Sequence, residues 1–224
     1  MLKRLVLLST IAILISPLVF ASDREDDVIR TQRAATVFHE IMQAPAGGIP
    51  RDLLHKAKCI AIIPGDKKFA FVFGGNYGRG VVSCRNAQGW SAPMFLAIEG
   101  GSVGYQIGGS STDLILLFMN DHALHSLLSD NFKLGADASV AAGPVGRKAA
   151  AATDLKLNAE ILSYSRSKGV FAGVSLSGSV VKADKSGDEA LYGPNVDRHD
   201  ILSGKVHEAA SAHVLEHELQ RDAD

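Results

Sequence analysis

The sequence predicts an α+β fold: a single domain with a mostly antiparallel, glycine-rich β-sheet, curled toward a barrel, and flanking helices at both ends. Three observations support this. Between residues 59 and 119, apolar runs of strand length alternate with turns rich in glycine, proline and asparagine. Glycine supplies 22 of 224 residues without a three-residue period. Helical periodicity occurs near both ends, which places helices beside the sheet.

The first 21 residues have the pattern of a secretory signal peptide. Lys3 and Arg4 precede an apolar stretch from Leu5 to Phe20, and small residues precede a cleavage point after Ala21. The stretch is shorter than the roughly 20 residues that a spanning helix needs, although an uncleaved anchor is the alternative. No cysteine stands directly after the cleavage point, the nearest being Cys59, which excludes a lipoprotein anchor. We therefore expect a periplasmic or secreted protein.

Two helices are expected before the sheet. From Asp27 to Ala44, apolar residues recur three and four positions apart, as on one face of an amphipathic helix. Pro45 and two following glycines end that helix. A second, short helix starts at residues 49–54, with Pro50 in its first turn.

Strands follow, and two further helices. The expected strands are residues 59–63, 69–73, 80–84, 94–98 and 114–119, with a long strand segment at 170–181 after the pattern resumes beyond Leu134. Short helical patterns are expected at 121–128 and 206–219. The turn between the first two strands is predicted at Pro64–Asp66, where proline and glycine favour chain reversal.

Export changes the meaning of the two cysteines. In an oxidising compartment Cys59 and Cys84 could form one disulfide, worth ~3 kcal/mol by loop entropy. The alternative is two separate buried thiols in apolar strands, and we favour the disulfide. No pattern for a cysteine-based zinc or redox site is present.

Several catalytic and cofactor classes are excluded by their patterns. The glycine clusters at 100–104 and 143–148 match neither a P-loop nor a dinucleotide fingerprint. His213, Glu216 and His217 match a zinc-protease motif, but only seven residues remain after it for the third ligand. No nucleophile elbow occurs. We therefore expect no enzyme, no cofactor and no metal site.

Charge is unevenly distributed along the chain. Residues 56–182 hold 13 basic and 8 acidic residues, a net of +5, whereas residues 22–55 and 183–224 carry −2 and −6. The basic residues of the middle segment often stand at turns, where they could contact anionic head groups. The candidate lipid-binding residues are Lys67, Lys68, Arg79, Arg85, Arg147, Lys148, Arg166 and Lys168. The alternative is a solvated rim with counter-charges nearby.

Several motifs resemble one family. They are residues 90–93, 100–108, 112–113, 134–147, 163–176 and 191–193, which follow in order. On these the chain is identified as a member of the SYLF domain family, a lipid-binding module also described as an actin-binding region in eukaryotic endocytic proteins. The resemblance covers Ile49 to Gly193. It implies binding of phosphoinositides or other anionic phospholipids and no catalysis.

The resemblance gives a division of the chain and a set of partners. We expect a signal peptide at 1–21, a helix and linker at 22–48, the lipid-binding domain at 49–193 and an acidic helical tail at 194–224. In eukaryotic members an N-terminal amphipathic helix meets the membrane, but here Arg30 and Arg33 are the only cations at 27–44. We expect an anionic lipid partner, no nucleic acid and, because of export, no actin. The alternative is an envelope structural or stress-related protein that binds a protein or lipopolysaccharide.

Overall fold

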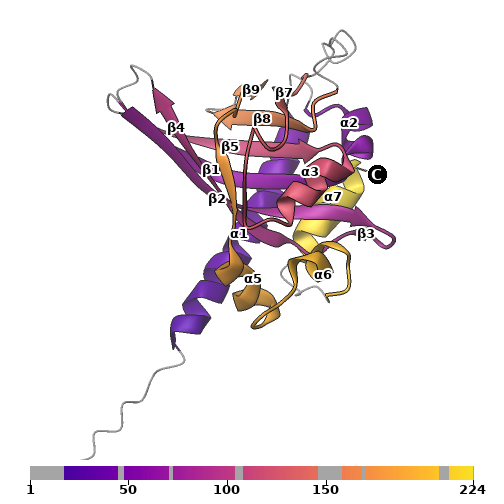
Figure 1. Ribbon diagram of the computed structural model, residues 1–224. Coiled ribbons are helices and arrows are strands. Elements are labelled where there is room, and N and C mark those ends of the chain that lie inside the picture. The colour runs from indigo at the N-terminus through magenta and orange to yellow at the C-terminus, as the bar shows by residue number, and fades with distance from the viewer. Residues whose placement is uncertain are drawn as a thin grey trace, which may run out of the picture.

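The computed structural model of the chain describes residues 18–44, 48–70, 73–103, 108–145, 158–167, 170–206 and 212–223. Figure 1 shows a curled sheet with helices against it, which confirms the predicted α+β, single-domain fold. The helices are α1 (Leu18–Met42), α2 (Arg51–Lys56), α3 (Asp121–Leu127), α5 (Lys185–Tyr192), α6 (Arg198–Leu202) and α7 (His213–Ala223). The strands are β1 (Cys59–Ala70), β2 (Phe73–Asn86), β3 (Gly89–Trp90), β4 (Met94–Val103), β5 (Gly108–Phe118), β6 (Asn131–Lys133), β7 (Val140–Ala142), β8 (Ile161–Ser167), β9 (Val170–Gly173) and β10 (Val180–Ala183).

One sheet joins these strands in the order β6-β10-β4-β2-β1-β5-β8-β7, with β3 beside β2 and β9 beside β8. Among the described strand pairs only β7 and β8 run parallel. The long hairpins keep most neighbours antiparallel, because a tight turn can return the chain directly to the adjacent position. The sheet thus places residues from β1, β2 and β5 side by side, although they lie far apart in sequence.

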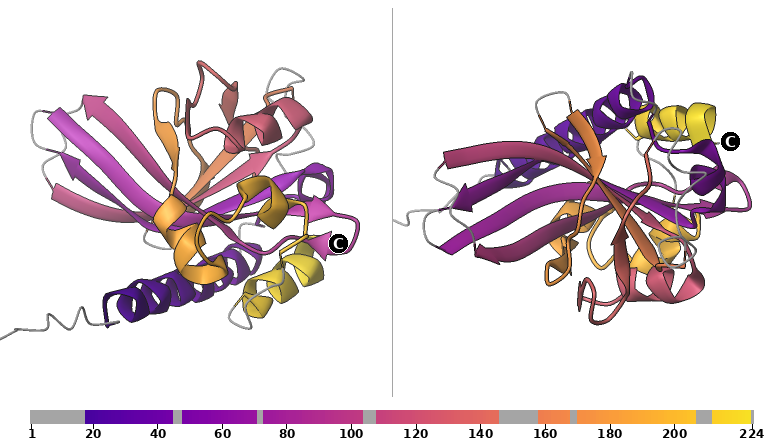
Figure 2. Two further views of the ribbon diagram at one scale, coloured as in Figure 1. Left: turned by 60° about the horizontal axis from the view of Figure 1, so that its bottom comes forward. Right: turned by 90° about the horizontal axis from the view of Figure 1, so that it is seen from above.

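Apolar side chains fill both faces of the sheet. Ile60 and Ile62 of β1 point into one core with Phe38 of α1, while Ala61 and Ile63 point into the other. Seen from above in Figure 2, α1 and α7 lie along one side of the sheet and α3 lies on the other. Because both faces are covered, the central strands are continuous apolar runs rather than an alternation of apolar and polar residues.

The structure corrects the predicted turn at Pro64–Asp66. There β1 continues to Ala70, and its register shifts between Ile62 and Lys67 against β2 and between Ile63 and Asp66 against β5. Such a bulge bends a strand without ending it. Gly65 adopts φ 64°, a conformation that favours glycine, and this explains why turn-forming residues occur inside a strand.

Other element boundaries also differ from prediction. Helix α1 begins at Leu18, nine residues before the expected start, and α7 begins at His213 rather than at residue 206. The expected segment 170–181 divides into β9 and β10, which pair with different strands. Helix α5 was not predicted, and α6 lies within the tail that was expected to be helical. Asp184 and Asp197 cap these helices, each accepting a hydrogen bond from a backbone N–H.

The disulfide between Cys59 and Cys84 is present, as predicted. The two residues face each other across β1 and β2, so the sheet register itself brings the sulfur atoms together. In the described residues no helix has both the length and the apolar character needed to cross a membrane. The signal peptide, the export and the four-part division of the chain stay predictions.

Candidate functional site

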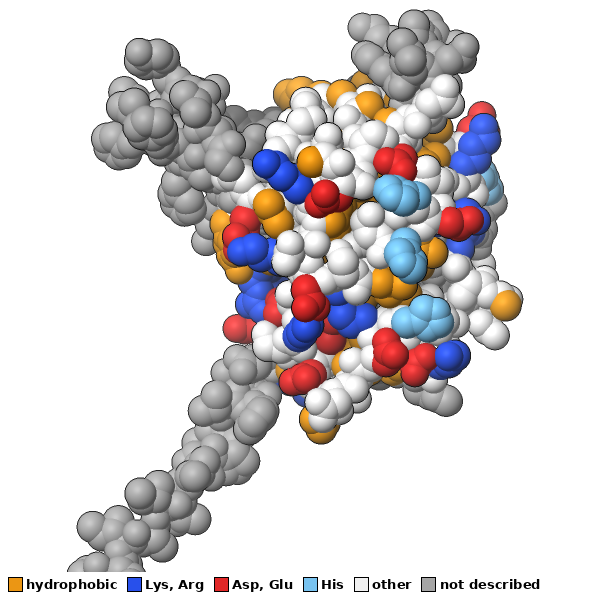
Figure 3. Space-filling view, in the orientation of Figure 1, with side chains coloured by type: hydrophobic (Ala, Val, Ile, Leu, Met, Phe, Trp, Pro, Cys, Tyr) orange, Lys and Arg blue, Asp and Glu red, His pale blue; other side chains and the backbone are white. Residues whose placement is uncertain are grey.

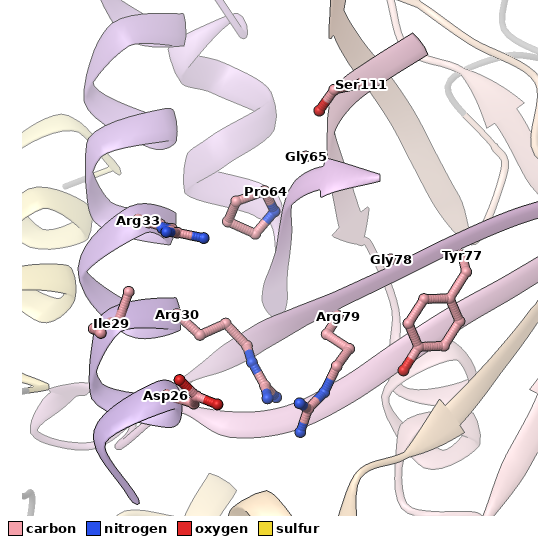
Figure 4. A pocket seen from close by; sticks show the side chains of 10 residues that line it. All are labelled: Asp26, Ile29, Arg30, Arg33, Pro64, Gly65, Tyr77, Gly78, Arg79 and Ser111. Carbon is pink, nitrogen blue, oxygen red and sulfur yellow. The ribbon is translucent and has the colours of Figure 1, made fainter. Parts of the chain in front are cut away.

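A hollow of about 520 Å³ opens between α1 and the sheet (Figure 4). Its helical wall is formed by residues spaced three and four apart, which therefore share one side of α1. Its opposite wall comes from β1, β2 and β5. The lining residues are Asp26, Ile29, Arg30, Arg33, Pro64, Gly65, Tyr77, Gly78, Arg79 and Ser111.

The bulge of β1 forms the floor of this hollow. The backbone N–H of Gly65 donates to Oδ1 of Asp113 at 2.9 Å, which fixes the bulged backbone against β5. A Cβ atom at Gly65 would lie 3.2 Å from Oγ of Ser111, so the floor is closely packed. The irregular strand therefore provides a defined surface beneath the arginines.

A buried ion cluster holds the helical wall in place. Arg30 pairs with Asp27 at 2.7 Å and with Asp184 at 2.8 Å, and Arg79 of β2 pairs with the same Asp184 at 2.7 Å. The guanidinium of Arg30 also lies over the ring of Phe95, 5.1 Å from its centroid. Residues from α1, β2, β4 and the start of α5 thus meet at one point.

Electrostatics keep Asp184 ionised within this cluster. Burial alone would raise the pKa of its carboxyl group, but hydrogen bonds from Arg79 and Arg30 outweigh burial and lower the pKa to about 2. The pKa of Arg79 is raised: burial opposes its charge, but the hydrogen bond to Asp184 and the charges of Asp184 and Asp27 together outweigh burial. Both groups are therefore charged at neutral pH.

Asp188 lies behind the cluster in a different electrostatic state. Its Oδ1 accepts a hydrogen bond from the backbone N–H of Phe95 at 2.7 Å, and its Oδ2 lies 3.6 Å from Nε of Arg198. Burial raises the pKa of Asp188 to about 7, and the nearby charges of Asp184 and Asp27 act in the same direction. This carboxyl group therefore changes its charge near neutral pH.

The mouth of the hollow combines apolar and cationic side chains. The described residues include four exposed large hydrophobic side chains, and two of them, Ile29 at 37% and Tyr77 at 47%, line this hollow. Arg33 is exposed, and no ion pair joins it to a carboxylate of the described residues. Figure 4 shows Arg33 directed from α1 toward the sheet. Such a mixed surface is typical of a binding site rather than of a solvated helix face.

The sequence-predicted cations do not gather at one site in the described part of the chain. Arg79 lines the hollow, whereas Arg166 pairs with Asp113 at 2.7 Å and with Glu40 of α1. Arg85 lies over the ring of Trp90, 4.4 Å from its centroid. On the face shown in Figure 3, acidic and basic side chains are intermingled.

The other candidate cations cannot be placed as side chains. For Lys67 and Lys68, which belong to β1, only the backbone is described. The described residues do not include Arg147, Lys148 or Lys168. Lipid binding by the eight candidates stays a prediction. Sequence reasoning missed Ile29, Arg33 and Tyr77 as site residues. One sequence signal could have indicated those on α1: positions 26, 29, 30 and 33 are spaced three and four apart and therefore share one side of that helix.

One cluster has the composition of a metal site. Ligand atoms of His39 on α1 and of Glu218 and Asp222 on α7 lie within 4.8 Å of one another. However, Nη2 of Arg221 lies 2.8 Å from Nδ1 of His39 and 2.6 Å from Oδ2 of Asp222. An arginine already supplies the positive charge here, and the cluster serves as a contact between the two helices.

Comparisons with known proteins identify the family. The family model described as Ysc84, Las17-binding protein actin regulator, matches residues 99–222. The chain belongs to this Ysc84 (SYLF) family. It is 38% identical over 162 residues to LAS seventeen-binding protein 3 of Saccharomyces cerevisiae, covering 70% of this chain and 35% of that protein. It is 32% identical over 191 residues to SH3 domain-containing YSC84-like protein 1 of Homo sapiens, covering 82% and 56%.

These names correct the predicted partners. We expected an anionic lipid and set actin aside, but the family is described as an actin regulator, and relatives are named for binding Las17. The comparisons therefore indicate protein partners for members of the SYLF family. They place the chain in a family of binding and regulatory domains. The chain spans about a third to just over half of the length of the relatives given above.

Proposed function

We propose that this SYLF protein is a non-catalytic binding module that docks a protein of the actin-assembly apparatus in the hollow between α1 and β2. One observation carries the proposal: exposed Ile29 and Tyr77 line a hollow that also contains arginines. Tyrosine and arginine dominate the binding energy of protein interfaces when they lie at the centre of the contact. The class of partner rests on the names of the family and its relatives.

The rigidity of the hollow also supports docking. Phe38 and Ile41 anchor α1 in the core, and the pairs of Arg30 and Arg79 with Asp184 hold the other end of the wall. A partner would therefore meet a helix and a sheet that are already held in place, so that less conformational entropy is lost on binding.

Cosedimentation with actin filaments tests the proposal. We expect the wild-type protein to pellet with filaments and Tyr77→Ala to lose most of this binding. Val170→Ala is the matched control, because Val170 is also exposed but lies on β9, outside the hollow. Wild-type protein that stays in the supernatant, or an equal loss in both variants, would overturn docking of actin filaments at this hollow.

Anionic phospholipid is measured in a parallel arm. Flotation with phosphatidylglycerol vesicles, and with phosphatidylcholine vesicles as a neutral reference, tests the lipid binding that the sequence predicts. In the described residues Arg85 and Arg166 already contact an aromatic ring or carboxylates, which reduces their availability to head groups. Binding to anionic vesicles alone would favour the lipid function over the protein one. Export after Ala21 is a separate prediction, tested by N-terminal sequencing of the isolated protein.

A further inference from the structure

We infer that the hollow binds an acidic segment of its protein partner: carboxylates meet Arg33 and Arg79, and apolar side chains pack against Ile29 and Tyr77. The inference rests on the proposed function, to which it adds the chemistry of the partner.

The charges that face solvent favour an acidic occupant. Asp27 and Asp184 have side chains only 2% and 10% exposed, and both are engaged by Arg30 and Arg79. The side chain of Arg79 nevertheless remains 41% exposed, so part of its guanidinium is open to a further acceptor. Guanidinium groups bind carboxylates through several N–H donors at once.

Arg33 is a second cation that lines the hollow. It lies on the same side of α1 as Arg30 and is exposed, and no ion pair links it to a described carboxylate. The opposing group in the lining is Asp26, which is exposed on the same helical wall. Among the described lining residues, two accessible guanidinium groups therefore face one accessible carboxylate, which favours an acidic partner over a basic one.

The apolar side chains distinguish a peptide segment from a small anion. Ile29 and Tyr77 contribute exposed apolar surface to the same hollow as the arginines. A free phosphate or a lone head group would engage the arginines but leave this surface in water. A segment with carboxylates beside a leucine or phenylalanine satisfies both, because burying apolar surface adds about 25 cal/mol per Å².

Fluorescence anisotropy with three labelled peptides tests the inference. The probe is a 12-residue peptide of aspartate and glutamate around a central Leu-Phe pair. One comparison peptide replaces every acid with its amide, and the other replaces the Leu-Phe pair with two serines. We expect the acidic, apolar peptide to bind at least about tenfold more tightly than either, and more weakly at 300 mM than at 50 mM salt.

Charge reversal on α1 locates the binding. Arg33→Glu is expected to weaken binding of the acidic peptide by about tenfold or more, because it places like charges together. Arg24→Glu is the matched control: Arg24 is exposed on the same helix, and nine residues of α-helix turn it to the opposite side from Arg33. Equal binding of the acidic and amide peptides, or no effect of Arg33→Glu, would overturn the inference.

The two proposals fail in different ways. If Tyr77→Ala abolishes filament binding but Arg33→Glu leaves it intact, the hollow docks a protein partner and the acidic chemistry is wrong. If neither variant affects filament binding, the proposed function of the hollow is wrong. If phosphatidylglycerol vesicles bind in an Arg33-dependent way and the peptides do not, the hollow binds anionic lipid, and the inference is refuted.

Discussion

The charge of Asp184 is expected to stabilise the fold by holding α1 against the sheet. The substitution Asp184→Asn tests this because asparagine caps helices as well as aspartate does, so that only the charge is removed. In the native protein this carboxylate accepts hydrogen bonds from Arg30 at 2.8 Å and from Arg79 at 2.7 Å. The variant leaves both guanidinium groups with Asp27 as their remaining carboxylate.

The magnitude follows from the pKa and from burial. Lowering the pKa of Asp184 from 3.8 to about 2 corresponds to about 2 kcal/mol of stability at neutral pH. Removing one member of a fully buried pair costs about 3–5 kcal/mol, but Arg79 is partly exposed and the cost is smaller here. We therefore expect Asp184→Asn to lower the free energy of unfolding by about 2–3 kcal/mol at pH 7.

Urea denaturation, followed by the fluorescence of Trp90, measures this loss. Because the pKa of Asp184 is lowered on folding, its contribution is complete above the unfolded pKa of 3.8 and is lost as pH falls through about 2. The difference between wild type and variant should therefore shrink between pH 4 and pH 2. Asp197→Asn is the matched control, since Asp197 is an exposed N-cap of α6, and its expected effect is within about 0.5 kcal/mol. Equal losses in the two variants, or a loss that persists at pH 2, would refute the electrostatic account.

Three further predictions concern the core. The pKa of Asp188 is raised to about 7, so the free energy of unfolding should fall as pH rises from 4 to 7. In urea titrations Asp188→Asn should make this pH dependence less steep, and an unchanged pH dependence would contradict the assignment. Replacing Cys59 and Cys84 with alanine should lower the free energy of unfolding by about 3 kcal/mol. Because both residues are buried, reductant should open the disulfide of the folded protein slowly, and rapid thiol labelling of the native protein in the presence of reductant would contradict this. A Cβ at Gly143 would lie 2.1 Å from the ring of Tyr164, so Gly143→Ala should lower thermal stability by about 1–3 kcal/mol, with partial rescue by Tyr164→Leu; an unchanged melting temperature would refute this close contact.

The sheet was predictable from the sequence because burial on both faces leaves a strong pattern. The runs that include Cys59 to Ile63 and Leu114 to Phe118 are apolar at every position, since each strand faces two cores. The disulfide was expected from export to an oxidising compartment, whereas the register of β1 and β2 that places Cys59 opposite Cys84 became apparent only in the structure. The turn at Pro64 was wrong because proline and glycine also occur in bulges, and local residue preferences do not distinguish the two.

The hollow was harder to predict because it depends on how α1 is placed against strands β1, β2 and β5, which are distant from it in sequence. The periodicity of α1 indicated an apolar face, and that face contains Phe38 and Ile41. The same buried face also carries Asp27 and Arg30, three residues apart, and a charged pair there is itself a signal of a polar contact. Asp184, the second carboxylate that pairs with Arg30, lies more than 150 residues further along the chain, and no local pattern predicts that pairing.

Charge along the sequence proved a poor guide to charge on the surface. The middle segment carries +5 and the flanking segments −2 and −6, which suggested an exposed basic surface. In the folded chain Arg79 pairs with Asp184 of the C-terminal segment, and Arg166 pairs with Glu40 of the N-terminal one. Opposite charges on separate segments thus neutralise one another within the molecule. Arg33, which lines the hollow without an ion pair to a described carboxylate, belongs to a segment whose sum is negative. The partner's charge therefore follows from the groups that intramolecular pairing leaves exposed, and not from the sum over any stretch of sequence.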